Sequence, residues 1–206
     1  GTTSVKSNIT IYARWTAKTC KVTLNKQSGL GGTGTVTATY DSDMPSADAP
    51  TRSGYTFGGY YTGTEGSGTQ YYTSSMGSNR KWDIDATTKT LYAKWTVNKI
   101  TIYADRNGGT GWSSTTGWTY SSSSQYYKSI NSGASIGSLP SATRTGYTFN
   151  DWWTSSSGGS RVYTYTTFNS SSTIYAHWTA KTYTVTLDRQ GGANGSTSVT
   201  ATYGSS

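Results

Sequence analysis

The sequence ITIYARWT at residues 9–16 returns as TLYAKWT at residues 90–96 and as TIYAHWT at residues 173–179. The tryptophans of successive copies are 80 and 83 positions apart. Recurrence of a motif at a near-constant interval is typical of tandem-repeat proteins. The sequence therefore predicts a repeat unit of about 80 residues.

Two further blocks recur in the same phase as this motif. GYTFGGYYT at residues 54–62 matches GYTFNDWWT at residues 146–154. A run that alternates apolar and polar residues follows each tryptophan motif, as CKVTLN at 20–25, ITIYAD at 100–105 and YTVTLD at 183–188. Alternation with a period of two predicts half-buried strands. The first of these runs would then turn its odd-numbered residues to water.

The side chains of Cys20, Val22 and Leu24 are accordingly expected to face a core. Near-identical runs, TVTATY at 35–40 and SVTATY at 198–203, follow the first and third copies after a Gly-containing connection. Two strand-like runs joined in this way predict a β-hairpin. The chain is thus expected to be mainly β.

The phase of the blocks divides the chain into four segments. We expect the end of a preceding repeat at residues 1–16, whole repeats at 17–97 and 98–180, and the opening hairpin of a following repeat at 181–206. The connections between segments are short, so we expect the repeats to be arranged as an elongated rod.

The composition favours small cores built from aromatic rings. Only 32% of the 206 residues are hydrophobic, but 18 are Tyr and 8 are Trp. Each such ring can bury roughly 150–250 Å², so rings can replace the aliphatic side chains of a large core. The rings shared by the repeated blocks are the expected core residues: Tyr12, Trp15, Tyr55, Phe57, Tyr92, Trp95, Tyr147, Phe149, Tyr175 and Trp178.

Charge and cysteine content exclude several classes of protein. The net charge is +8, but the basic residues are scattered singly, which is unlike a nucleic-acid-binding surface. No apolar run approaches the roughly 20 residues of a membrane-spanning helix. Cys20 is the single cysteine, so the chain has no internal disulfide.

No residues stand out as catalytic, cofactor-binding or metal-binding. His177 is the single histidine, and it replaces Arg14 and Lys94 of the other copies, which is typical of a solvated position. The acidic pairs Asp41/Asp43 and Asp83/Asp85 do not recur in the other repeats. We therefore expect no enzyme activity and no cofactor.

The combined blocks resemble the Listeria–Bacteroides repeat, the B-repeat of internalins. The resemblance covers the whole chain. It implies a small β-grasp-like unit that recurs in large surface-anchored or secreted bacterial proteins, where such units mostly act as stalks or spacers and some are implicated in adhesion. It brings no catalytic residues. Residues 112–136 depart from the pattern by lengthening the second repeat.

Two functions are compatible with these observations. The first is a structural spacer of an extracellular or cell-surface protein, adhesin-like or filament-forming, whose partners are neighbouring repeats and copies of itself. The second is a module that binds surface glycans, because flat rings with polar edges stack on sugars. The expected glycan contacts lie in the lengthened segment and are not repeated elsewhere: Trp112, Trp118, Tyr120, Tyr126 and Tyr127.

Overall fold

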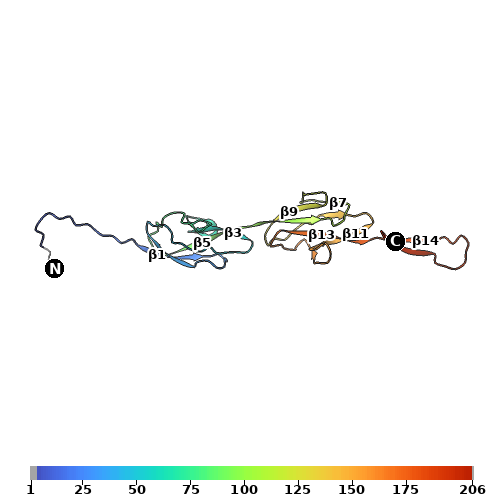
Figure 1. Ribbon diagram of the computed structural model, residues 1–206, viewed down its shortest axis with the longest axis horizontal. Coiled ribbons are helices and arrows are strands. Elements are labelled where there is room, and N and C mark those ends of the chain that lie inside the picture. The colour runs from blue at the N-terminus through green and yellow to red at the C-terminus, as the bar shows by residue number, and fades with distance from the viewer. Residues whose placement is uncertain (1–3, 206) are drawn as a thin grey trace. The chain divides into compact units, whose positions relative to one another are not determined.

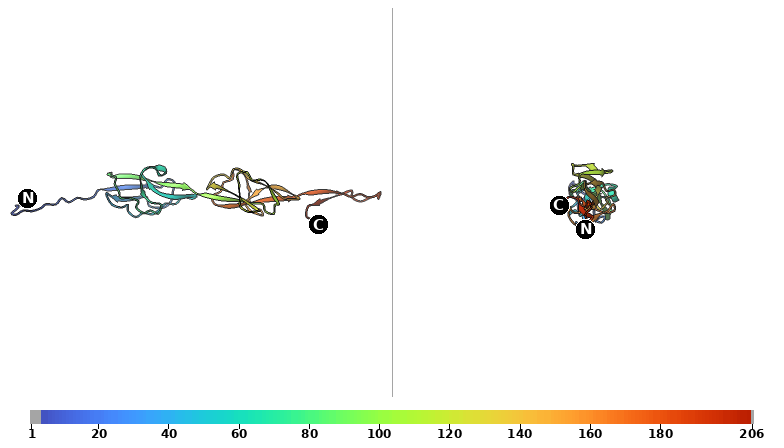
Figure 2. Two further views of the ribbon diagram at one scale, coloured as in Figure 1. Left: turned by 90° about the horizontal axis from the view of Figure 1, so that it is seen from above. Right: turned by 90° about the vertical axis from the view of Figure 1, so that its right-hand side faces the viewer.

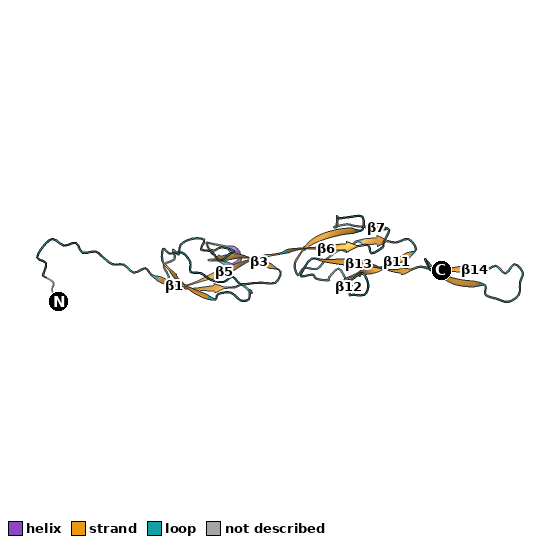
Figure 3. Ribbon diagram, in the orientation of Figure 1, coloured by secondary structure: helices purple, strands orange, loops and turns teal. Residues whose placement is uncertain are grey.

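The computed structural model describes residues 4–205, which divide into two compact units between Thr96 and Val97 (Figure 1). Both units are built from β-strands. The one helical element among the described residues is a short 3-10 turn, Thr64–Gly66, and there is no α-helix in this part of the chain (Figure 3). The expectation of a mainly β protein is therefore confirmed. No helix in residues 4–205 is long and apolar enough to cross a membrane.

The first unit holds one five-stranded sheet. Its strand order is β2-β1-β5-β3-β4. The first and last strands lie side by side and parallel, with Leu24 opposite Leu91, whereas β1 and β2 form an antiparallel hairpin with Cys20 opposite Ala38. The strands are β1 (Thr19–Asn25), β2 (Thr35–Thr39), β3 (Tyr55–Tyr61), β4 (Gln70–Tyr72) and β5 (Thr88–Val97).

The core of this unit is rich in tyrosine. Along β1 the side chains of Cys20, Val22 and Leu24 are buried and their neighbours are exposed, which confirms the predicted alternation. They pack in one cluster with the fully buried rings Tyr60, Tyr71, Tyr72 and Trp82. Three of these four rings belong to β3 and β4. Aromatic side chains therefore fill much of a core that contains few aliphatic residues.

The second unit repeats this plan with an insertion. Its six-stranded sheet has the order β12-β11-β13-β6-β9-β8, and a separate two-stranded sheet joins β10 to β7. The first and last strands are again parallel, with Ile102 opposite Ser172. The strands are β6 (Lys99–Asp105), β7 (Gly111–Ser114), β8 (Thr119–Tyr120), β9 (Gln125–Asn131), β10 (Ser141–Thr143), β11 (Tyr147–Trp153), β12 (Arg161–Val162) and β13 (Ser172–Ala180).

The insertion changes which strand pairs with the first strand of the repeat. In this unit β9 takes the place that β2 holds in the first one, because Ile100 is paired with Ile130 as Cys20 is with Ala38. Strands β7 and β8 lie between β6 and β9 in the sequence and have no counterpart in the first unit. We call residues 17–97 the first repeat and residues 98–180 the second repeat. The two buried clusters fall within these ranges.

The chain continues into a hairpin of two strands, β14 (Thr182–Thr186) and β15 (Ser198–Thr202), which we call the terminal hairpin. Every residue in both strands is exposed. Figure 1 and the left view of Figure 2 show two strands with no further layer over them. A lone hairpin is marginally stable in water, so contacts with the second repeat matter for its position.

The expected core residues fall into four groups. Phe57, Trp95, Phe149 and Trp178 do pack against the buried clusters. Tyr92 and Tyr175 are half-buried on the opposite face, since they alternate along their strands with buried residues. The interpretation of these two as core residues is therefore wrong.

The prediction is also wrong for Tyr12 and Trp15, which are 84% and 90% exposed. Residues 4–18 form no strand, so nothing in the described chain packs against these rings. Tyr55 and Tyr147 are half-buried at the start of β3 and β11, where each lies beneath an arginine.

Candidate repeat–repeat interface

Asp83 and Asp85 lie in contacts with other side chains of the first repeat. Residues 4–205 contain no group of three or more His, Cys, Asp or Glu residues placed to hold a metal ion. Asp83 accepts a hydrogen bond from the Tyr71 hydroxyl and pairs with Arg80, and both contacts lower the pKa of Asp83. Asp85 pairs with Lys18 at 2.7 Å. These carboxylates therefore have structural partners.

His177 also has a structural setting. Its ring stacks on Trp153, with 4.8 Å between ring centroids and 6° between planes, and its Nε2 lies 2.9 Å from the Ser155 carbonyl oxygen. No carboxylate forms a hydrogen bond or ion pair with this histidine in the contacts of the described residues.

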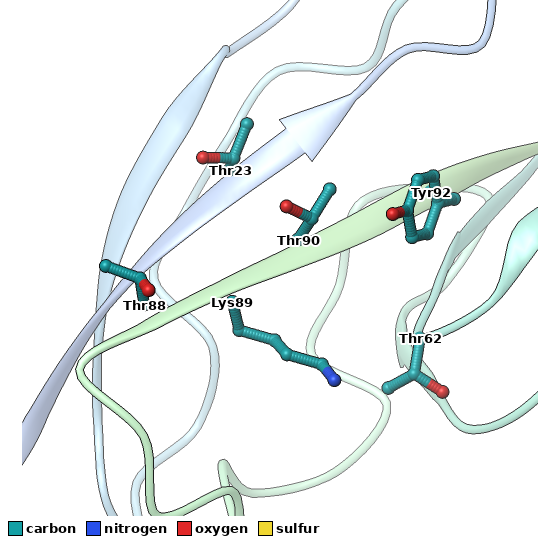
Figure 4. A pocket seen from close by; sticks show the side chains of 6 residues that line it. All are labelled: Thr23, Thr62, Thr88, Lys89, Thr90 and Tyr92. Carbon is teal, nitrogen blue, oxygen red and sulfur yellow. The ribbon is translucent and has the colours of Figure 1, made fainter.

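Most hollows on the described surface are open and polar. Figure 4 shows one beside β1 and β5, of 340 Å³, in which Lys89 is the one charged side chain. Threonine hydroxyls and a tyrosine supply the remaining polar groups, so the hollow offers hydrogen bonds but no acid–base pair. Its lining residues are Thr23, Thr62, Thr88, Lys89, Thr90 and Tyr92.

The interpretation of Trp112 and Trp118 as exposed glycan contacts is wrong, because Trp118 is buried in the core and Trp112 is half-buried against it. Trp118 is 8% exposed and donates a hydrogen bond from Nε1 to the Ser138 carbonyl oxygen. Trp112 packs edge-on against Tyr126, 4.9 Å away, and stacks on Trp152. The insertion folds back over the sheet because burying large rings offsets the entropy lost in ordering a serine-rich segment.

The remaining rings of that set differ in exposure. Tyr126 packs against the buried cluster, and Tyr127 is half-buried beside Tyr103. Tyr120 is 62% exposed and touches Tyr126 edge-on. A single exposed ring remains of the five that were expected to bind sugars.

A different exposed pair of rings was missed by the sequence reasoning. Tyr163 and Tyr165 are 40% and 71% exposed and stack in parallel, with centroids 5.1 Å apart and planes 2° apart. The spacing of two positions is a signal that could have identified them, because such residues share a face of extended chain.

A recurring turn precedes β3 and β11. In the second repeat the Tyr147 amide donates to the Arg144 carbonyl oxygen at 3.1 Å, and Gly146 between them has a φ of +76°. That backbone conformation favours glycine. The Arg144 guanidinium lies over the Tyr147 ring at 3.8 Å. Residues 52–55 repeat this geometry with the same hydrogen bond, φ and cation–π distance. We call it the Arg-x-Gly-Tyr turn.

The terminal hairpin is held on this turn. The Lys181 amide donates to the Gly146 carbonyl oxygen at 2.9 Å, and the Tyr203 amide donates to the Lys181 carbonyl oxygen at 2.8 Å. The Tyr203 ring meets Tyr147 edge-on, with centroids 5.8 Å apart. A Cβ on Gly146 would lie only 2.2 Å from the Tyr203 ring. Glycine is therefore required at position 146 for two reasons: its positive φ and the close approach of the Tyr203 ring.

We call Gly146, Tyr147, Lys181 and Tyr203 the tyrosine joint. The sequence reasoning placed Gly146 and Tyr203 in separate strand blocks and did not connect them. The signal was present, because a Gly-Tyr pair opens one recurring block and a tyrosine closes another. Only the fold brings these two blocks together.

The comparisons agree with this repeat organisation. Residues 21–94 and 101–177 each match the Listeria-Bacteroides repeat domain. The chain belongs to the Listeria-Bacteroides repeat family. The resemblance carried by the recurring motifs is thereby confirmed. The two matches cover most of the first and second repeats, including the parallel strand pairs of this Listeria-Bacteroides repeat protein.

Two relatives come from Evansella cellulosilytica. One, named "Putative Gly-rich membrane protein", is 31% identical over 157 residues, which are 74% of this chain and 17% of that protein. Another, named "Putative membrane protein", is 28% identical over 110 residues, 52% of this chain and 15% of that protein. The chain thus spans less than a fifth of the length of these relatives. No solved structure matches the chain.

Proposed function

We propose that this chain is a structural spacer in the array of a bacterial cell-envelope protein, surface-anchored or secreted. The family match supports a repeat role, and the relatives that are named as membrane proteins support an envelope location. The partners of each repeat are its neighbours in the chain. In this proposal the wider protein is adhesin-like or filament-forming, and the repeats supply distance rather than chemistry.

The observation that carries this proposal is the tyrosine joint. The terminal hairpin has no core of its own, yet backbone hydrogen bonds and one ring seat it on the second repeat. Each repeat, by contrast, closes its own aromatic core. Nearest-neighbour contacts between self-contained units are the architecture by which repeat arrays gain length.

We further propose that the repeat is a variant of the β-grasp plan without an α-helix and that successive repeats form a stiff, extended rod. The shared feature is the mixed sheet with a parallel central pair. Where a repeat is followed by a unit that carries the joint tyrosine, the joint adds stiffness, because a ring packed against a glycine restricts rotation between the two units more than a flexible linker does.

The test compares the full chain with chains in which residues 18–97, which carry both Tyr40 and an Arg-x-Gly-Tyr turn, are present two or three times in tandem. Small-angle X-ray scattering gives the maximum dimension of each particle. The proposal expects a constant increment of length for every added repeat. Particles that grow in all directions, with no constant increment, would contradict a spacer. Thermal unfolding of each chain checks that the added repeats are folded.

A second candidate function is glycan binding at exposed rings. The parallel stack of Tyr163 and Tyr165 favours it, with the Arg161 guanidinium 5.1 Å from the Tyr163 ring centroid. A glycan array probed with the full chain and with Tyr165→Ala tests this candidate. Binding that the substitution leaves unchanged excludes these rings as the site, and Tyr120→Ala serves as the matched exposed-ring control.

A further inference from the structure

The first repeat carries an unoccupied counterpart of the tyrosine joint. Tyr40 ends the run TVTATY as Tyr203 ends SVTATY. The Tyr40 amide donates to the Lys18 carbonyl oxygen at 2.8 Å, and the Tyr203 amide donates to the Lys181 carbonyl oxygen at the same distance. The strand registers agree as well, with Thr19 opposite Thr39 and Thr182 opposite Thr202.

The surface around Tyr40 is open in this chain. Tyr40 is 43% exposed, as Tyr203 is, but unlike Tyr203 it makes no ring contact among the described residues. A hollow of 260 Å³ lies beside it. The lining residues are Thr16, Ala17, Lys18, Tyr40 and Asp85. The hydroxyl and the ring of Tyr40 are therefore available to a partner.

The neighbouring residues identify what that partner is. Residues 9–16 carry the sequence of the last strand of a repeat, but Ile11 and Trp15 are 85% and 90% exposed. In the second repeat the same strand, β13, lies against β11, with Ala180 opposite Tyr147. The strand that would cover Trp15 therefore begins with an Arg-x-Gly-Tyr turn. It would also bring that turn to Tyr40.

We propose that the surface formed by Lys18 and Tyr40 receives the Arg-x-Gly-Tyr turn of another copy of the repeat. The ring of Tyr40 lies over the glycine of that turn, as the ring of Tyr203 lies over Gly146. The inference rests on the proposed function, because it assigns the contact by which one repeat is seated on the next in an array.

The second repeat lacks this ring, which makes the joint selective. Its residue at the position of Tyr40 is Ser132, whose amide donates to the Asn98 carbonyl oxygen at 2.8 Å. The hairpin β6–β9 therefore presents a hydroxymethyl group where β1–β2 and β14–β15 present a phenol. Repeats of the first kind take a tyrosine joint, and repeats of the second kind cannot form it.

The test uses a fused chain in which residues 1–180 are followed directly by residues 18–206. Lys18 then takes the place of Lys181, so Gly146 of the first half faces Tyr40 of the second half. Glycine-selective ¹³C labelling gives the Hα chemical shifts of both copies of Gly146. A ring over the glycine moves an Hα resonance upfield, and the original chain with Tyr203→Ala gives the ring-free position.

We expect both Gly146 copies of the fused chain to show the upfield position. Tyr40→Ala in the second half should move one of them to the ring-free position, while Tyr40→Phe should move neither. The Gly146 that remains under Tyr203 reports within the same molecule that the fold is intact. A first-half Gly146 already at the ring-free position, or one that ignores Tyr40→Ala, overturns the proposal.

The two proposals can fail separately. If an array lengthens by a constant increment while Tyr40 stays free, the proposed contact of Tyr40 is wrong and the spacer function still holds. If the Tyr40 ring lies over Gly146 but the particles do not lengthen, the contact is supported and the spacer function is contradicted.

Discussion

Trp112 stacks on Trp152 with 6.0 Å between the ring centroids and 15° between the ring planes. One ring comes from the inserted segment and the other from a block that both repeats share. The insertion is therefore fastened to the sheet by its aromatic residues and contributes to the core of the second repeat. Trp112, which the sequence suggests as an exposed glycan contact, thus stabilises the fold of the second repeat.

Replacement of Trp112 should destabilise the second repeat. We expect Trp112→Ala to lower the free energy of unfolding by about 3 kcal/mol, since it removes the stack on Trp152 and leaves a cavity. Urea unfolding followed by tryptophan fluorescence measures the change. The control Tyr120→Ala removes a 62% exposed ring and should cost about 0.5 kcal/mol or less. Equal losses for both variants would mean that Trp112 is not packed in the core.

Replacement of Gly146 should release the terminal hairpin. In Gly146→Ala the new Cβ meets the Tyr203 ring, and alanine also adopts a φ of +76° at a cost of about 1 kcal/mol. We expect faster hydrogen exchange at the amides of Lys181 and Tyr203, measured by NMR. Gly133→Ala carries the same backbone cost, with a φ of +78° and its nearest contact at 3.7 Å, so it should leave both amides protected.

Alkaline pH should unfold the first repeat selectively. Burial raises the pKa of both Tyr60 and Tyr72 from 10.0 to about 12. The neutral phenols are favoured in the folded state, so their contribution is complete below pH 10 and is lost as the pH rises to 12. Each rise in pKa corresponds to roughly 2.7 kcal/mol. The buried core of the second repeat contains no tyrosine. Residue-resolved hydrogen exchange from pH 9 to 11 should therefore show opening in the first repeat alone.

The hydroxyl of Tyr60 offers a control for this pH effect. It is buried without a hydrogen-bond partner among residues 4–205, whereas the Tyr72 hydroxyl donates to the Pro45 carbonyl oxygen at 2.7 Å. Tyr60→Phe should therefore stabilise the first repeat at neutral pH by about 1 kcal/mol and weaken its alkaline sensitivity. A loss of stability in this variant at neutral pH would show that the hydroxyl has a favourable contact.

The thiol of Cys20 should report the opening of the first repeat. It is 1% exposed, and burial raises its pKa, so both access and thiolate formation are suppressed in the folded state. We expect a thiol-specific reagent to label Cys20 only at urea concentrations that unfold this repeat. Rapid labelling of the native chain would contradict the packing of β1 against the core.

The sequence predicts which side of a strand is buried better than it predicts which strands are adjacent in the sheet. Period-two alternation identified the buried side of β1, where Cys20, Val22 and Leu24 are buried and their neighbours are exposed. Alternation fixes the direction of a side chain but carries no information about which strand lies alongside. The parallel pairing of β1 with β5 was for that reason not anticipated.

The burial of the inserted tryptophans and the tyrosine joint were not predicted for a related reason. Trp112 and Trp118 stand among serine and glycine, a composition that indicates a loop. Trp112, however, lies in a strand that pairs with β10 some 30 residues later, and Trp118 donates a hydrogen bond to the Ser138 carbonyl oxygen. The contact between Gly146 and Tyr203 likewise joins blocks that are distant in the sequence. Such contacts depend on the order of strands in the sheet. The repeated motifs show that this order recurs, but they do not show which strands are neighbours.

The parallel neighbours β1 and β5 have a mechanical consequence. Lys21 lies opposite Thr88 and Asn25 opposite Tyr92, so the chain enters the pair at one end and leaves it at the other. Tension applied through the backbone pulls these strands past each other in shear, and the hydrogen bonds between them share the load instead of unzipping in turn. The pair β6 and β13 is oriented in the same way. Each repeat can thus withstand stretching along the chain even though its individual hydrogen bonds are weak.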